Sequence, residues 1–292
     1  MQLDLERDDL MALLQRASAM AAHRFLDTER SALGPKLPTE DVRRLFAEPL
    51  PEDGMSWQAL LAKVESEVFA NSMRSTSPDF YGLVTSCGNP YGIAGELLAA
   101  GLNQVVVREN VAPAATAVEA QVLRWLAQFI GTPHEHGGVM VSGGSAANLV
   151  GLMAARCAKG PPDLADKGLS AAPPMTVYTS TGAHLCIDKA VDILGLGREQ
   201  LRKIPVAEED FRIRLDRLRA AILEDRERGA RPLAIVAQGG GVNTGAVDDL
   251  NALADLCAEQ DMWLHVDGAY GAPAAGTESG RPLFAGLERV DS

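Results

Sequence analysis

Three short segments of this sequence carry side chains that could do chemistry, and each follows an apolar run. Gly143-Gly144-Ser145 opens an expected helix, where free backbone N–H groups and the helix dipole favour an anion such as a phosphate. His184 follows a second apolar run, and its flat imidazole could stack on an aromatic ring or move a proton. Asp267 ends a third run. Together the segments offer an anion cradle, a ring-stacking group and a buried acid.

Each segment also has a plain structural interpretation. The glycine turn could be an ordinary strand-to-helix turn with Ser145 as its N-cap, and it is neither a P-loop nor a GxGxxG fingerprint. His184 could be a packing or capping residue. Asp267 ends a strand that we expect to be buried on both faces, so its carboxylate needs a cation or several donors. A protonated ring nitrogen of a cofactor would supply that cation; a magnesium ion, an arginine or backbone donors are the alternatives.

The elements that position these groups alternate along the chain after Pro113. We expect helices over 115–129, 146–158, 184–194, 211–228 and 248–260, and strands or short extended runs at 138–141, 175–179, 204–206, 233–237 and 263–266. This alternation predicts an α/β fold, a mainly parallel sheet with helices on both faces. Ligands of such sheets bind beyond the carboxyl ends of the strands, where all three groups lie.

The residues before this alternation predict a helical N-terminal arm. Their spacing indicates helices over about 5–27 and 57–71, a loop-rich connector over 35–51, a short extended piece before residue 90, and a buried helix over 91–104. We therefore divide the chain into a helical arm or cap at 1–100 and a large domain at 101–292.

Composition favours a function that acts on a small molecule. Lys and Arg number 27 against 39 Asp and Glu, and the net charge of -12 argues against nucleic acid or an anionic membrane as partner. The four cysteines form no CxxC pair, and we interpret His134 and His136 as solvent-exposed, so we expect no metal site. We see no signal peptide and no transmembrane segment, which makes the cytoplasm the expected location.

Taken in order, four motifs resemble those of the group II pyridoxal-phosphate-dependent amino-acid decarboxylases, which include aromatic-amino-acid, glutamate and diaminobutyrate decarboxylases. The motifs are Gly143-Gly144-Ser145 with Asn148, Ala183-His184 with Lys189-Ala190, Asn243-Thr244-Gly245-Ala246 with Asp248, and His265-Val266-Asp267-Gly268-Ala269-Tyr270-Gly271. The resemblance implies a fold type I architecture of the pyridoxal-phosphate-dependent transferases and a homodimer with its active site at the subunit interface. It also implies pyridoxal 5'-phosphate (PLP) as cofactor, a small-molecule amino-acid substrate and a carboxy-lyase reaction.

The resemblance assigns a role to each candidate site residue. Gly144, Ser145 and Ala146 would cradle the cofactor phosphate, and His184 would stack on the pyridine ring. Asp267 would pair with the ring nitrogen, and Ala269 would pack against the other face of the ring. His184 and Asp267 are therefore the candidate catalytic residues, since a ring nitrogen that stays protonated makes the ring a better sink for the electrons left by CO₂.

The sequence departs from the family pattern in two places. Many members read Gly-Thr-Thr-Asn-Thr-Gly where this chain reads Gly240-Gly241-Val242-Asn243-Thr244-Gly245, so a threonine that often touches the cofactor is replaced by Val242. The family's Schiff-base lysine follows shortly after an Asp-Ser pair, and Asp291-Ser292 are the last two residues here. We therefore expect an incomplete form of a decarboxylase, lacking that lysine and the small C-terminal domain, with the activity of the chain as given left open.

Two rival interpretations remain. Aminotransferases and cysteine desulfurases share the acid and the phosphate turn, but they usually follow the acid-bearing strand with a different Ser-x-x-Lys arrangement. A non-catalytic remnant that binds PLP weakly is the second rival. The absence of GxGxxG disfavours a Rossmann dehydrogenase. The sequence does not assign the amino-acid substrate.

Overall fold

The chain consists of two compact units, an N-terminal unit at Met1–Gln104 and a large unit at Val105–Ser292. The computed structural model describes residues 5–26, 32–86, 88–133, 135 and 137–292. The cofactor-type motifs singled out in the sequence all belong to the large unit, so this unit alone positions them.

The large unit is built on a parallel sheet. Among the described residues its four strands follow the order β2-β1-β3-β4, and each neighbouring pair is parallel. The strands are β1 (Met175–Ser180), β2 (Leu201–Ile204), β3 (Arg231–Gln238) and β4 (Trp263–Asp267). Every residue of β1 is buried, as expected for a strand with helices over both faces. Gln238 pairs with Asp267, so β3 and β4 end side by side.

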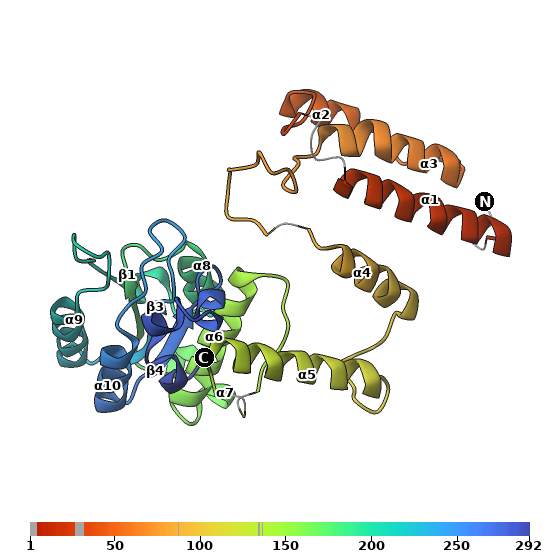
Figure 1. Cartoon of the computed structure of the whole chain (residues 1–292). Helices are drawn as coiled ribbons and strands as arrows, with labels where there is room; N and C mark the ends of the chain where they lie inside the picture. The colour runs from red at the N-terminus through yellow and green to blue at the C-terminus, as the bar shows by residue number, and fades with distance from the viewer. Residues whose placement is uncertain (1–4, 27–31, 87, 134, 136) are drawn as a thin grey trace. The chain divides into compact units, whose positions relative to one another are not determined.

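Helices cover both faces of this sheet, as the sequence predicts (Figure 1). On one face lie α6 (Gly144–Lys159) and α8 (Cys186–Ile193), and on the other lie α9 (Leu215–Glu227) and α10 (Leu250–Gln260). Neighbouring β1 residues alternate between the two cores: Val177 packs with the α6 and α8 side, and Tyr178 with the α9 and α10 side. The expected α/β class, mainly parallel with helices on both faces, is confirmed.

A buried ion pair fixes α9 to the edge of the sheet. The Asp225 side chain is 2% exposed, and Nη2 of Arg202 on β2 lies 2.6 Å from its Oδ1. The Tyr178 hydroxyl donates to Asp225 Oδ2 at 2.7 Å. Burial raises the pKa of Tyr178, so its hydroxyl stays protonated and donates.

Residues 291–292 run along the outer side of β4. The Ser292 N–H donates to the Leu264 carbonyl at 3.3 Å, and the Val266 N–H donates to the Ser292 carbonyl at 2.8 Å. The Asp291 carboxylate accepts the Leu264 N–H at 2.8 Å. This alternating pattern is that of a parallel neighbour, and it places Ser292 beside His265.

The remaining elements of the large unit connect and support this sheet. Helix α5 (Pro113–Ile130) precedes α6, and α7 (Leu164–Lys167) leads toward β1. The Phe129 ring of α5 lies against Gly276, which belongs to the 3-10 turn Ala272–Gly276. Further 3-10 turns are Leu169–Ala171, Arg198–Gln200, Arg281–Phe284 and Leu287–Arg289. These helices and turns connect the layers and add no strand to the sheet.

The N-terminal unit is helical, as expected for an arm. It holds α1 (Arg7–Leu26), α2 (Thr39–Leu45), α3 (Trp57–Lys63) and α4 (Pro90–Leu102), and α3 continues through a π-helical turn at Val64–Val68 and a 3-10 turn at Phe69–Asn71. Ser56 caps α3 by accepting the Ala59 N–H, and Asn89 caps α4. Arg16 and Glu65 tie α1 to the π-helical turn at 3.0 Å.

Several expected elements of the N-terminal unit differ from the structure. The connector at 35–51 was expected to be loop but contains α2. The extended piece expected before residue 90 consists of turns and bends, with Cys87 outside the described residues. Helix α4 exists, yet every residue from 90 to 102 is exposed rather than buried. Its apolar composition correctly indicates a helix but carries no information about what packs on it.

Two expected strands of the large unit also differ. Residues 138–141 form no strand in the structure, because a strand needs a hydrogen-bonded neighbour and the Met140 N–H instead donates to Glu119 Oε1 at 3.0 Å. The strand expected at 204–206 lies earlier, as β2. His134 and His136 fall outside the described residues.

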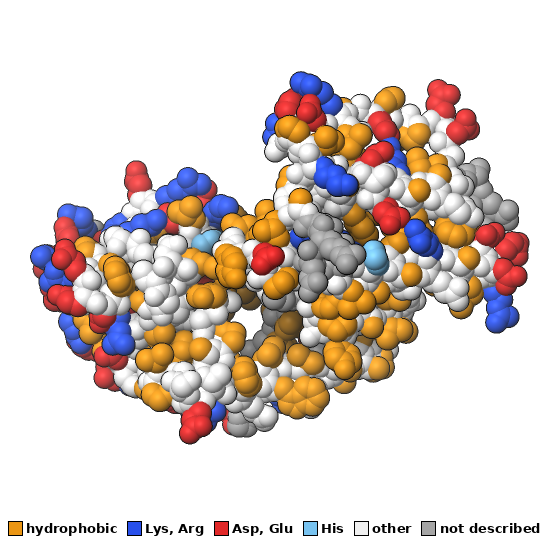
Figure 2. Space-filling model, turned by 45° about the horizontal axis from the view of Figure 1, so that its top comes forward, with side chains coloured by type: hydrophobic (Ala, Val, Ile, Leu, Met, Phe, Trp, Pro, Cys, Tyr) orange, Lys and Arg blue, Asp and Glu red, His pale blue; other side chains and the backbone are white. Residues whose placement is uncertain are grey.

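Hydrophobic side chains are common at the surface of both units (Figure 2). No helix in the described part of the chain is long and apolar enough to cross a membrane. Within that same part, no cluster of three or more His, Cys, Asp or Glu side chains could hold a metal ion.

Candidate functional site

The start of α6 is an anion-binding turn in form. Gly143 precedes the helix with φ 142°, a backbone conformation that favours glycine. The N–H groups of Ala146 and Ala147 both donate to the Gly143 carbonyl at 3.0 Å. Among the described residues, the N–H groups of Gly144 and Ser145 have no acceptor, and they lie at the positive end of the helix dipole. An anion is the natural partner for these two donors.

The turn after β4 lies directly against the start of α6. A Cβ atom added at Gly144 would lie 3.0 Å from the Cβ of Ala269, which is tighter than ordinary packing. Asp267 stands at the end of β4, and its Oδ1 accepts the Ala269 N–H at 3.3 Å. No lysine, arginine or histidine within the described ranges forms an ion pair with Asp267, so a carboxylate without a cation lies beside the anion-binding turn.

His184 lies just before α8 and is exposed. Its Nδ1 accepts the Cys186 N–H at 3.2 Å, so the ring is held at the helix start with Nε2 as the nitrogen left for another partner. The pKa of the buried Cys186 thiol is raised, first by burial and then by the negative charge of Asp267.

Asn148 connects all three segments. Its Nδ2 donates to the Gly144 carbonyl at 2.9 Å and to Cys186 Sγ at 3.4 Å. Its Oδ1 lies 2.8 Å from Nε2 of His265, two residues before Asp267 on β4. One buried side chain therefore touches the anion-binding turn, the helix that follows His184 and the strand that carries Asp267.

The glycine run after β3 packs against the turn after β4. Gly240 has φ 90°, and a Cβ atom there would lie 2.6 Å from Cα of Gly271. The Gly239 N–H donates to the Asp267 carbonyl at 2.9 Å. The two backbone segments lie too close together for side chains at these positions, which is why glycines occur there. The hydrogen bond from Gly239 also holds the Asp267 carbonyl in place.

Asp248 anchors the end of β3 beside the site. Its carboxylate is buried and accepts the N–H groups of Gln238 and Ile213 at 2.7 and 2.8 Å. Burial is the largest influence on its pKa and raises it, against these two hydrogen bonds. The Gln238 side chain in turn donates to Ser180 Oγ at the end of β1, at 2.5 Å. The ends of β1, β3 and β4 are thus held together.

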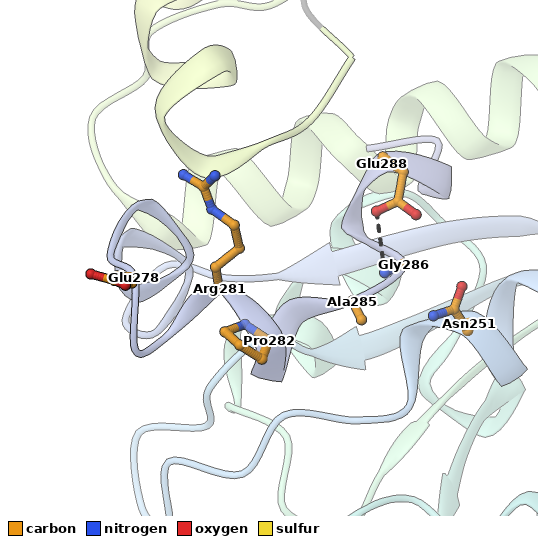
Figure 3. A pocket seen from close by; sticks show the side chains of 7 residues that line it. All are labelled: Asn251, Glu278, Arg281, Pro282, Ala285, Gly286 and Glu288. Carbon is orange, nitrogen blue, oxygen red and sulfur yellow. Dashed lines mark hydrogen bonds between the residues drawn. The ribbon is translucent and has the colours of Figure 1, made fainter.

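A separate cavity of the large unit does not belong to this site. It has a volume of about 550 Å³ and is lined by Asn251, Glu278, Arg281, Pro282, Ala285, Gly286 and Glu288 (Figure 3). Glu288 accepts the Gly286 N–H at 3.2 Å, and the charged side chains point in different directions rather than to a common centre. None of the site residues named above lines it.

The chain belongs to the pyridoxal-dependent decarboxylase family, because residues 39–292 match the conserved domain of that family. The parallel sheet, the anion-binding turn and the acid at the end of β4 agree with this family. Members of the family use a pyridoxal cofactor, and a solved relative, Oryza sativa TDC, contains PLP.

Two named relatives are amino-acid decarboxylases. The chain is 32% identical to the aromatic-L-amino-acid decarboxylase of Bacillus atrophaeus, over 99% of this chain and 58% of that protein. It is 31% identical to the cysteine sulfinic acid decarboxylase of Mus musculus, over 87% of this chain and 50% of the relative. The chain thus spans between half and three fifths of the length of these proteins.

Solved structures agree in fold. The crystal structure of Oryza sativa TDC with PLP and tryptamine gives a TM-score of 0.91 at 29% identity, covering 100% of this chain and 61% of that one. The apo form of mouse CSAD gives 0.90 at 28% identity, covering 98% and 60%. The expected fold type I architecture is confirmed.

The residues of this chain fit PLP. The two unpaired N–H donors of Gly144 and Ser145 suit a phosphate, and the carboxylate of Asp267 suits a protonated ring nitrogen. A side chain at position 144 would meet Ala269. The glycine there therefore keeps the turn open beside Ala269. The family, the cofactor chemistry and the local geometry agree.

Sequence reasoning identified the three segments but missed the residues that hold them together. Asn148, Asp248 and His265 belong to the motifs, but no role was predicted for them. The available signal was the position of Asn148, one helical turn after Gly144, where its side chain can reach back to the start of its own helix. Nothing in the sequence indicated that His265 and Ser292 meet.

Proposed function

We propose that this protein decarboxylates an amino acid with PLP as cofactor, releasing CO₂. The observation that carries the proposal is the meeting of an anion-binding turn with an acid that has no cation, through the contact between Gly144 and Ala269. Family membership supports the reaction class.

Each site residue receives one role. The N–H groups of Gly144 and Ser145 bind the phosphate, with Ala146 completing the turn through its own bond to Gly143. His184 stacks on one face of the pyridine ring, and its position is set by the Cys186 N–H. Ala269 packs on the other face.

Asp267 holds a proton at the ring nitrogen. A protonated pyridine ring supplies the electron sink that accepts the pair of electrons left when the substrate carboxylate departs. The Ala269 N–H and the fixed Asp267 backbone orient the carboxylate, and the nearby Cys186 remains a neutral thiol. Val242 brings no hydroxyl to the cofactor, so any polar contact made by a threonine in related proteins is absent at this position.

Family membership supports the wider assignments. We propose that residues 1–104 act as the arm of a homodimer, that 105–292 form the PLP-binding domain, and that the protein works in amino-acid metabolism in the cytoplasm. The exposed apolar residues of α4 support a role in association.

The test begins with the purified protein and PLP. We expect a change in the PLP absorbance spectrum, and borohydride reduction followed by mass spectrometry will report any modified lysine. Aromatic amino acids and cysteine sulfinic acid, the substrates named for two relatives, form the first substrate panel. Release of CO₂ in step with amine supports the proposal, whereas a keto acid without CO₂ assigns the protein to the aminotransferases.

A matched pair of variants tests whether the charge of Asp267 is needed. Asp267→Asn keeps the shape but loses the charge, so we expect phosphate-dependent binding to persist and CO₂ release to fall sharply. Asp249→Asn makes the same chemical change at the exposed N-cap of α10, where asparagine caps equally well. Equal activity in both variants would contradict the role of Asp267.

A further inference from the structure

A chain of hydrogen-bonded side chains, buried at Asn148 and His265 and exposed at Ser292, lies behind the proposed cofactor site. Trp263 Nε1 donates to Ser292 Oγ at 2.8 Å, and Ser292 Oγ lies 2.8 Å from Nδ1 of His265. Nε2 of His265 lies 2.8 Å from Asn148 Oδ1, and Asn148 Nδ2 reaches the Gly144 carbonyl. The chain therefore runs from β4 and its neighbouring segment to the anion-binding turn.

The direction of each hydrogen bond follows from the two ends. The Gly144 carbonyl can only accept, so the amide group of Asn148 must present its NH₂ there. Both of its N–H bonds are then used, one on Gly144 and one on the Cys186 sulfur. Asn148 Oδ1 is left as an acceptor, and its partner Nε2 of His265 must carry the hydrogen.

The other side of His265 then has only one consistent arrangement. Burial lowers the pKa of His265 to about 4, so the ring is neutral near pH 7 and carries one hydrogen. With that hydrogen on Nε2, Nδ1 accepts from the Ser292 hydroxyl, and Ser292 Oγ accepts from the Trp263 indole. Every donor in the chain has an acceptor.

Helix α6 makes room for this arrangement. A Cβ atom added at Gly151 would lie 2.5 Å from Cε1 and 2.6 Å from Nδ1 of His265. The imidazole therefore occupies the space beside a residue without a side chain, and it packs directly on the helix whose first turn binds the anion. A side chain at Gly151 would push the ring or the helix away.

We propose that Asn148 and His265 are positioning residues, which hold the anion-binding turn at a fixed spacing from Asp267 through a directed chain of hydrogen bonds from Trp263 to Gly144. The inference rests on the proposed function, because it takes that spacing to match the distance between the cofactor phosphate and ring nitrogen. Asn148 and His265 touch neither group themselves.

The first experiment tests the direction of the chain without any cofactor. Long-range proton–nitrogen NMR spectra of the ¹⁵N-labelled protein distinguish protonated from unprotonated imidazole nitrogens. We expect one histidine, identified by its loss in His265→Gln, to be the neutral form with hydrogen on Nε2 from pH 7 down to pH 5.5. A ring protonated on Nδ1, or on both nitrogens, in this range overturns the directed chain.

The second experiment tests positioning. We expect Asn148→Ala to weaken PLP binding about tenfold or more, as loss of supporting hydrogen bonds does at metal sites, and to shift the ³¹P resonance of the bound phosphate. Gly151→Ala, which removes no polar group, should act in the same direction. Leu218→Ala is the control, because this fully buried residue of α9 belongs to the core on the other face of the sheet.

The outcomes separate positioning from general stability. A merely structural role predicts that Asn148→Ala and Leu218→Ala, compared at a temperature where both are folded, bind PLP equally well with unchanged ³¹P resonances, and that result overturns the proposal. If the wild-type protein fails to bind PLP, the proposed function fails and the positioning role fails with it. The tautomer of His265 still decides whether the directed chain exists.

Discussion

Acid should destabilise this protein through His265 in a defined pH window. The pKa of His265 falls from the ordinary 6.5 to about 4 because the ring is buried, although the charge of Asp267 opposes the fall. The unfolded chain therefore binds more protons between pH 6.5 and pH 4, so stability rises with pH there and is lost as pH falls. Each pH unit within the window corresponds to about 1.4 kcal/mol, so about 2 kcal/mol is lost between pH 6.5 and pH 5.

The assay compares two proteins, so that other titrating groups cancel. Urea unfolding of wild type and His265→Gln is measured from pH 7 to pH 5, and the difference between their free energies of unfolding should change by about 2 kcal/mol in favour of the variant as pH falls. His23→Gln, an exposed histidine on α1, should leave the pH dependence as in wild type. A constant difference between wild type and His265→Gln across this range would refute the reasoning.

Three further substitutions test separate parts of the structure. Asp225→Ala should cost about 3–5 kcal/mol of stability in urea unfolding, because Arg202 loses its buried carboxylate, while PLP binding stays as in wild type. Gly144→Val should weaken PLP binding at least about tenfold, since the new side chain meets Ala269, and unchanged affinity in a titration would contradict the placement of the phosphate. Gly95→Ala has open space in α4 and should gain up to about 1 kcal/mol in the same unfolding assay.

The sheet was predictable because its central strands are buried on both faces. The central strand β3 and the half-buried β4 at the end of the sheet order appear in the sequence as short apolar runs between helical segments. The structure places both within one or two residues of the expected bounds. Residues 138–141 have the same local composition and form no strand, because pairing depends on a neighbour that lies elsewhere in the chain. Local composition therefore identifies candidates for strands, and long-range contacts select among them.

The candidate site was predictable for a related reason. His184 and Asp267 follow strands of the parallel sheet, whose carboxyl ends meet at one edge, whereas the apolar run before Gly144 forms no strand. Their mutual geometry was not predictable, because it depends on side chains 38 and 117 residues away from Asn148. No local pattern distinguishes this asparagine from one that merely bonds its own helix.

The hydrogen-bonded chain also gives a physical reason for a histidine at position 265. A leucine would satisfy the core at that point, but it would leave Asn148 Oδ1 buried without a donor. A lysine would bring a charge that burial opposes. A neutral imidazole donates on one side and accepts on the other, and it is flat enough to lie against Gly151. The same burial that keeps the ring neutral at pH 7 makes it a weak point in acid, so the arrangement that supports the anion-binding turn should also determine where the protein begins to lose stability.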